Sequence, residues 1–389
     1  MDILIGTNHL VEMAGSELIC LEMAEYFARR GHRLTLFANV AGKPMAELFR
    51  SRLGLRIITE PRVIAPFSYD LVYFQHQVAG LFDYRVDAAS RERSAFVFGR
   101  LGRRSFMESG GWTHDRLLAN ACFANSDATA EALNGLGLST PITTFYNSAP
   151  SAFFRPAPPA TRRLRKITVI TNHLDPTLKV ALDRLALDLK VEHIGRQSVQ
   201  RRVTPELIGG CDLVVSIGKT VPYALVARVP VYVYDHFGGP GYLTDSTFAR
   251  AAWFNFSGRC CERRLEPAEL ARELVEGYPA ADGFARRLEN AALERYRLEP
   301  YLDAMLATPP TSNAARVQRL AADPMVRQER LLAVYVREQT FGAIHYRAHK
   351  PFRVAMALIK ALKASRRWRR SMVRKARYRV ARLRQSFSA

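Results

Sequence analysis

Several features that would assign a function directly are missing from this 389-residue sequence. No apolar run approaches the roughly 20 residues that a membrane-spanning helix needs, so no such span is predicted. The five cysteines are odd in number and contain no Cys-x-x-Cys pair. This pattern argues against a disulfide framework or a zinc site and favours a reducing, cytoplasmic location.

The common nucleotide-binding motifs are also missing. The sequence has no Gly-x-Gly-x-x-Gly after its first predicted strand, no Walker A loop and no Asp-x-Asp pair, which argues against a dinucleotide cofactor and a metal-held phosphate. His, Cys and carboxylate residues do not cluster at metal-ligand spacing. We therefore expect neither a cofactor nor a metal.

Acidic residues are missing from the C-terminal end, where none follows Glu338. Residues 347–389 carry fifteen Lys or Arg, and the other 42 basic residues nearly balance the 36 acidic ones, so this tail accounts for most of the net charge of +21. Four apolar residues share one helical face beside lysines: Phe352, Met356, Ile359 and Leu362. That pattern favours a helix on an anionic membrane surface. Solvated charge and nucleic-acid binding are the alternatives, and nucleic acid is not the partner we expect.

Strand and helix patterns alternate through two halves of the chain, which predicts α/β folding around parallel sheets. Short apolar runs predict strands at 2–6, 33–38, 70–74, 118–126, 142–146, 167–170, 191–194, 213–217 and 229–234. The helix predicted at 15–31 ends at Gly31. The Pro- and Arg-rich stretch 154–166 indicates a linker. We therefore predict an N-terminal domain at 1–153, a C-terminal domain at 167–305, and a basic helical extension at 306–389.

The tetrapeptide Thr-Asn-His-Leu occurs at residues 7–10 and again at residues 171–174. Each copy follows the first predicted strand of a half, at the edge where parallel sheets bind ligands. Asn8 and His9 are thus candidates in the first half, and Asn172 and His173 in the second. The alternative is that these side chains only satisfy the backbone groups of a turn.

Other candidates come from helix starts and strand ends. Gly15 and Ser16 open the first long helix, where free N–H groups attract an anion, although a plain helix start explains them equally well. His76 follows the strand at 70–74 and could act as a base or contact a substrate. In the second half, two successive strands end in sequences suited to phosphate, although the later glycines could form a tight turn: Gly218, Lys219 and Thr220, then Asp235, His236, Gly238, Gly239 and Gly241.

The stretches "ILIGTNHLVEMAGSELICLEMAEYFARRGHRLTLFA", "DLVYFQHQ" and "CFANSDATAEAL" resemble the GT-B glycosyltransferases, in particular family 4-like enzymes of bacterial surface-polysaccharide assembly. The resemblance covers roughly residues 1–300. It implies two Rossmann-like domains facing a cleft, an acceptor site in the first, and a nucleotide-sugar site in the second. It further implies transfer of a sugar to a glycan or lipid-linked acceptor at the inner face of the membrane.

The same resemblance implies an outline of the chemistry. The donor diphosphate would be held without a metal by 218–220, 238–241 and Arg196, while His76 or His9 orients the acceptor hydroxyl or takes its proton. The family's donor-side glutamate pair is missing, since residues 218–225 contain no glutamate. Asp235 or Asp245 could replace it. A non-catalytic GT-B module that binds a nucleotide-sugar or glycan is therefore the alternative function, and a nucleic-acid-binding protein is a third.

Overall fold

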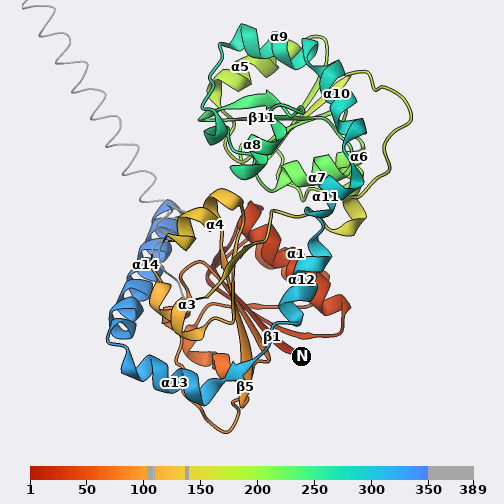
Figure 1. Ribbon diagram of the computed structural model, residues 1–389. Coiled ribbons are helices and arrows are strands. Elements are labelled where there is room, and N and C mark those ends of the chain that lie inside the picture. The colour runs from red at the N-terminus through yellow and green to blue at the C-terminus, as the bar shows by residue number, and fades with distance from the viewer. Residues whose placement is uncertain (103–107, 109, 136–139, 349–389) are drawn as a thin grey trace, which may run out of the picture. The chain divides into compact units, whose positions relative to one another are not determined.

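The computed structural model describes residues 1–102, 108, 110–135 and 140–348. The chain forms two units, Met1–Val334 and Tyr335–Ala389. Both predicted Rossmann-like domains lie within the first unit, and the account below concerns that unit (Figure 1). The predicted apolar stripe at 352–362 and nearly all of the basic tail lie outside the described residues.

The first domain is built on a parallel sheet in the order β3-β2-β1-β4-β5-β6-β7. Its strands are β1 (Asp2–Leu10), β2 (Arg33–Ala41), β3 (Ile57–Ile58), β4 (Leu71–Gln75), β5 (Arg93–Arg100), β6 (Ala121–Ala124) and β7 (Ile142–Thr144). Its helices are α1 (Gly15–Arg29), α2 (Met45–Leu53), α3 (Trp112–Leu118) and α4 (Asp127–Asn134). The order of the strands reverses at β1, because β1 pairs with β2 on one side and with β4 on the other.

The sheet of the first domain is buried on both faces because apolar residues follow one another in its strands. Ile3 and Ile5 of β1 pack toward α1 and α2, whereas Leu4 between them packs toward Phe74 and α3. Gly31 has a positive φ of 79° just after α1, and the chain turns there into β2.

The second domain has a five-stranded sheet in the order β12-β11-β10-β8-β9, parallel except for β12. Its strands are β8 (Lys166–Ile170), β9 (Lys190–Ile194), β10 (Leu213–Ser216), β11 (Val231–Asp235) and β12 (Gly238–Tyr242). Its helices are α5 (Pro176–Leu185), α6 (Pro205–Gly209), α7 (Thr220–Val226), α8 (Phe248–Trp253), α9 (Pro267–Glu276), α10 (Tyr278–Arg287) and α11 (Asn290–Glu294). Helices α5 and α9 cover one face, and α7 and α8 cover the other.

After α11 the chain returns to the first domain. Leu298, Leu302 and Met305 of α12 (Leu298–Leu306) belong to the same apolar core as α1, and the two helices lie side by side in Figure 1. The short strand β13 (Thr311–Ser312) then pairs antiparallel with β5, and α13 (Asn313–Ala322) packs by α3 before α14 (Met325–Ala348) begins. Residues 298–322 thus complete the first domain, although the sequence pattern assigned them to the second domain and the extension.

The predicted α/β fold class, with two Rossmann-like sheets, is confirmed. Several strands differ from the sequence prediction, which did not include β3, β12 or β13. Strand β1 continues to Leu10, so the first Thr-Asn-His-Leu lies in the strand, paired with β2, and not in a loop. The sequence reading also omitted β5, a fully paired strand in the middle of the first sheet.

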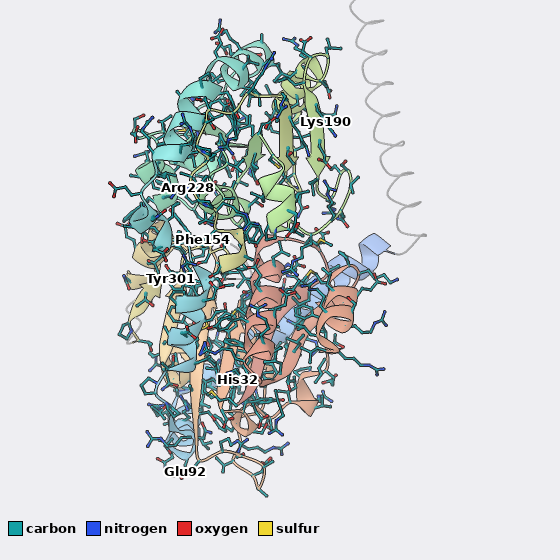
Figure 2. All side chains as sticks on the ribbon, turned by 90° about the vertical axis from the view of Figure 1, so that its right-hand side faces the viewer. His32, Glu92, Phe154, Lys190, Arg228 and Tyr301 are labelled. Atoms are coloured by element: carbon teal, nitrogen blue, oxygen red, sulfur yellow. The ribbon has the colours of Figure 1, made fainter. Side chains whose placement is uncertain are left out.

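The two sheets point their carboxyl ends toward each other. Figure 2 shows Phe154, which follows the first domain, where the chain crosses between the domains. Glu92 directly precedes β5, and Lys190 begins β9; both lie away from this crossing, so the strands run toward it. Within the described part of the chain, every helix is too short or too polar to cross a bilayer.

Candidate functional site

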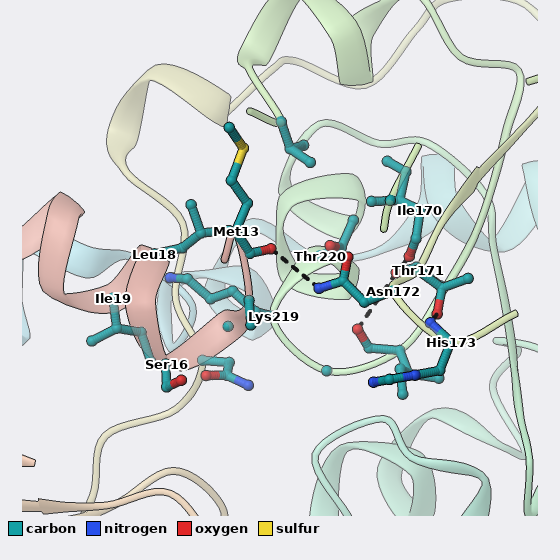
Figure 3. Close-up of a pocket in the computed structure, with 18 of the residues that line it drawn as sticks. Met13, Ser16, Leu18, Ile19, Ile170, Thr171, Asn172, His173, Lys219 and Thr220 are labelled. Atoms are coloured by element: carbon teal, nitrogen blue, oxygen red, sulfur yellow. Dashed lines mark hydrogen bonds between the residues drawn. The ribbon is translucent and has the colours of Figure 1, made fainter. Parts of the chain in front are cut away.

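A cavity of about 480 Å³ lies between the carboxyl ends of the two sheets, within the size range of small-molecule sites (Figure 3). The first domain contributes the turn after β1, the start of α1, and His76 after β4. The second domain contributes the segments after β8, β9, β10 and β11. In each domain the strand order of the sheet reverses at the strands that line the cavity. Open α/β sheets bind ligands at such a reversal.

His76 is buried in the wall of the first domain, with a positive φ of 64° directly after β4. Its Nδ1 lies 3.0 Å from Oγ1 of Thr7 and accepts the N–H of Asn8 at 3.5 Å. Burial, together with the smaller effects of the nearby His9 and Arg100, lowers the pKa of His76 to about 3. The ring is therefore neutral at physiological pH.

A carboxylate that the sequence reading did not single out lies beside this histidine. Oε1 of Glu108 lies 3.6 Å from Nε2 of His76 and accepts the N–H of Leu101 at 3.1 Å. Burial raises the pKa of Glu108 to about 7, whereas the Arg100 guanidinium opposes that increase. Arg100 itself forms a buried ion pair with Asp115. The wall therefore combines a neutral imidazole with a carboxyl that titrates near neutrality.

The N-terminus of α1 enters the cavity through Gly15 and Ser16. The preceding turn is held by Glu17, whose Oε1 accepts the N–H of Val11 and of Glu12, each at 2.8 Å. The first N–H groups of an α-helix have no partner within the helix. Their partial positive charge favours an anion at this end of the cavity.

The second domain lines the opposite wall with Asn172 and His173, which follow β8 in a bend. Nδ2 of Asn172 donates to the carbonyl of Met13 at 3.4 Å, as Figure 3 shows, and its Oδ1 accepts the N–H of Arg196 at 3.1 Å. Asn172 thus connects the two walls. The His173 side chain stays exposed beside it.

Lys219 lines the cavity between β10 and α7, but its ammonium group is not free. Nζ lies 2.7 Å from Oε2 of Glu22 on α1 and donates to the Ser148 carbonyl. Tyr223 donates its hydroxyl to the other oxygen of Glu22. Burial lowers the pKa of Lys219, and Glu22 counteracts the effect. The sequence predicted a phosphate contact at Lys219, and the structure places its ammonium group in a buried interdomain ion pair.

Asp235 reaches the cavity at the end of β11, together with His236. Its Oδ1 accepts the N–H of Phe237 at 2.7 Å, and its Oδ2 accepts the Ser257 hydroxyl and the Gly258 N–H, both at 3.1 Å. The carboxylate is therefore occupied in shaping the loop at 255–258. Asp245 is exposed, pairs with Arg287, and is not among the described residues that line the cavity.

The structure brings ten of the predicted site residues to one cavity: Gly15, Ser16, His76, Asn172, His173, Gly218, Lys219, Thr220, Asp235 and His236. Other predicted residues lie elsewhere among the described residues. Asn8 is buried in β1 and accepts a hydrogen bond from Asn39 at 2.7 Å. The ring of His9 stacks on His76 from outside the cavity lining. Arg196 pairs with Glu12 at 3.5 Å, next to the cavity but not in its lining.

The glycines at 238–241 also lie outside the lining and have a structural explanation. They form β12, which pairs antiparallel with β11. A Cβ on Gly239 would stand 2.1 Å from the Val233 carbonyl oxygen, and one on Gly238 would stand 2.0 Å from that of Arg263. Close backbone packing therefore requires glycine here, as in the tight-turn alternative.

The sequence reading missed Glu108, Asn147 and Asn255, which also line the cavity. Asn147 donates to Oδ1 of Asn255 at 2.8 Å across the two domains. Local sequence patterns do not bring these residues together, so their position depends on tertiary folding. Among the described residues, no group of three or more His, Cys, Asp or Glu side chains is arranged to hold a metal ion.

No protein-family model matches this sequence, and no curated protein matches it. Similar solved structures include WaaG, a glycosyltransferase involved in lipopolysaccharide biosynthesis, at 10% identity over 78% of this chain and 99% of that chain, with a TM-score of 0.46. A UDP-GlcNAc 2-epimerase from Neisseria meningitidis bound to UDP-GlcNAc is 12% identical over 79% of this chain and 99% of that chain, with a TM-score of 0.45. MurG of Acinetobacter baumannii is 11% identical over 79% of this chain and 99% of that chain, with a TM-score of 0.44. The fold assignment rests on the topology of the two sheets.

Proposed function

We propose that the protein is a glycosyltransferase that moves a sugar from a nucleotide-sugar donor to a glycan or lipid-linked acceptor. The supporting observation is the position of the cavity: it is lined by both Rossmann-like sheets, in each case at the place where the strand order reverses. One wall carries His76 and Glu108, whose side chains can form hydrogen bonds to a substrate hydroxyl, and the other wall lies at the edge of the second sheet where ligands bind. The family 4-like resemblance at 1–300 agrees with this reaction.

The proposal places the donor's diphosphate in the cavity, beside Gly15–Ser16 and Gly218–Thr220. Two helix starts meet there, since a Cβ on Gly15 would stand 3.3 Å from Cβ of Lys219. N–H groups at helix starts stabilise the negative charge that develops on a departing diphosphate. In this proposal no metal ion is needed for that stabilisation, and transfer should continue when a chelator is added.

The acceptor would enter from the first domain, past His76 and Glu108. We place the reaction in the cytoplasm, in bacterial surface-polysaccharide assembly, where the basic tail at 347–389 would hold the protein on the anionic inner face of the membrane. The tail's composition supports this part of the proposal.

A second candidate is a non-catalytic module that binds a nucleotide-sugar or glycan. Two observations favour it: residues 218–225 contain no glutamate, and Lys219 is already paired with Glu22. This candidate predicts ligand binding without any transfer of sugar.

The test combines binding with turnover. A ligand that binds the native state alone raises the melting temperature, so UDP, GDP and dTDP with their sugars are screened by thermal shift, with and without EDTA. Donors that stabilise the chain are then incubated with lipid-linked acceptor extract, and sugar transfer is followed. His173→Ala should reduce the increase in melting temperature. The control is His32→Ala, which should not reduce it, because His32 precedes β2 and is not part of the cavity lining. Binding without transfer would favour the second candidate, and no shift from any nucleotide would contradict both.

A further inference from the structure

The hydrogen bonds around His76 determine which ring nitrogen carries the proton. Nδ1 accepts the main-chain N–H of Asn8 at 3.5 Å, and the Thr7 hydroxyl lies 3.0 Å from the same atom. A main-chain N–H can donate but not accept. Nδ1 therefore presents its lone pair to Asn8, and in a neutral ring the hydrogen must be on Nε2.

This tautomer limits what His76 can do. Its Nδ1 lone pair is occupied by donors, and its Nε2 carries a hydrogen, so neither nitrogen is available to take a proton from a substrate. Burial keeps the ring neutral by lowering its pKa to about 3. His76 is therefore suited to donating a hydrogen bond through Nε2 and not to acting as a general base.

Glu108 offers the basic atom that His76 lacks. Among the described residues, its Oε2 is buried and finds no hydrogen-bond partner. Nη1 of Arg100 lies 3.9 Å away from that oxygen, and the Arg100 Nε and Nη2 atoms bind Asp115 instead. A buried carboxylate oxygen without a partner is costly unless another group binds it. Because Glu108 lines the cavity, a substrate hydroxyl is a suitable partner.

We propose that Glu108 takes the proton of the acceptor hydroxyl, while His76 holds that hydroxyl or the donor sugar through its Nε2 hydrogen. The acceptor O–H bond breaks and its proton moves to the Glu108 carboxylate, while the same oxygen forms a bond to the anomeric carbon of the donor sugar. The bond from that carbon to the donor phosphate breaks, and its electron pair leaves on the diphosphate. Glu108 then returns the proton to water. This assignment rests on the proposed glycosyl transfer.

The groups facing Glu108 support this role. Arg100 on β5, Asp115 on α3 and His76 after β4 surround it. Burial raises its pKa to about 7, against the opposing effects of Arg100 and of the Leu101 N–H. Arg100 favours the ionised form and Asp115 the protonated form, while His76 stays neutral. A general base works best when its pKa lies near the working pH.

The test compares carboxyl and amide variants in the full chain. General-base catalysis contributes about 10²- to 10⁴-fold, so Glu108→Gln should lower kcat by about 100-fold or more and leave donor affinity unchanged. The pH profile of kcat should lose its limb near neutrality. Glu108→Asp should keep that limb at a reduced rate. His76→Gln retains an N–H donor and should keep the limb too, and Glu276→Gln, exposed on α9, serves as the control.

The outcomes separate the two proposals. The role of Glu108 would be overturned if a folded Glu108→Gln variant transferred sugar at the wild-type rate. It would also be overturned if His76→Gln alone lost the limb near neutrality in the pH profile of kcat. Either result would leave the proposed glycosyl transfer intact. Absence of transfer by the wild type would overturn both. Nitrogen-15 NMR provides a readout apart from turnover: we expect the His76 signals of a neutral ring protonated at Nε2 across pH 5 to 8. Protonation at Nδ1 would contradict the assignment.

Discussion

Nζ of Lys219, in the second domain, lies 2.7 Å from the Oε2 atom of Glu22 on α1 of the first. Both side chains are almost completely buried. A buried ion pair is strongly destabilised when one partner is removed, because the other is left as an uncompensated charge. The Lys219 ammonium group therefore stabilises the fold through this ion pair and is not held available to bind a ligand.

Lys219→Ala should accordingly lower the free energy of unfolding, by about 3–5 kcal/mol. The double variant Glu22→Gln/Lys219→Met should recover part of this loss, since no buried charge remains and glutamine can still accept the Tyr223 hydroxyl. Urea unfolding of Glu22→Gln, Lys219→Met and the double variant, each compared with the wild type, gives the coupling energy. Strictly additive effects would show that the two side chains do not interact.

Two glycines should respond differently to alanine. Gly239→Ala places a Cβ 2.1 Å from the Val233 carbonyl oxygen and should cost about 1–3 kcal/mol of stability. Gly218→Ala meets no atom within 4 Å but keeps a φ of 58°, so about 1–2 kcal/mol is expected. Nucleotide affinity should change for Gly218→Ala, which lines the cavity, and not for Gly239→Ala. A calorimetric titration showing the reverse would restore 238–241 as a phosphate loop.

Stability should depend on pH through Glu108. Its pKa in the folded chain is about 7, above its ordinary value of 4.5, so the folded state binds the proton more tightly. Stability from this group is therefore present below about pH 4.5 and lost as the pH rises through 7. His76 acts in the opposite direction at lower pH, since its pKa is lowered to about 3.

A comparison with Glu108→Gln isolates the carboxyl from these other groups. Relative to that variant, the wild type should lose free energy of unfolding between pH 5 and pH 8 in urea titrations. Parallel curves for the two proteins would show that Glu108 has an ordinary pKa in the folded chain.

The return of the chain to the first domain can be tested at α12. Leu302 is fully buried in the core shared with α1, so Leu302→Ala should cost about 2–5 kcal/mol. Leu187→Ala, at a side chain that is 86% exposed, is the control and should change stability by less than about 0.5 kcal/mol. Equal effects would contradict the packing of α12.

The basic tail should determine membrane binding if the proposed location is correct. Deleting residues 347–389 should release the protein from anionic vesicles in a flotation assay and leave the melting transition of residues 1–334 unchanged. Neutral vesicles should bind neither form. Persistent binding of the shortened chain to anionic vesicles would place the membrane contact elsewhere.

Local patterns predicted much of the fold, because buried parallel strands are continuous apolar runs and helix ends carry their own signals. Gly31, just after α1, is an example. The strand ends and the start of α1 predicted ten of the residues that line the cavity, because open α/β sheets bind ligands at the carboxyl ends of their strands. What the patterns could not provide were the partners of each side chain. Lys219 looked available because Glu22 is distant in sequence, and Glu108 was overlooked because no spacing connects it to His76.

The segments that join the two domains are hydrogen-bonded to each other. Ala149 donates to the Tyr296 carbonyl at 2.7 Å, and Leu298 donates to the Ala149 carbonyl at 3.0 Å. The chain therefore passes between the domains twice, and a single parallel bridge between Ala149 and Arg297 joins the two passages. Because the two passages are hydrogen-bonded to each other, any movement of one domain against the other has to bend both of them at the same place.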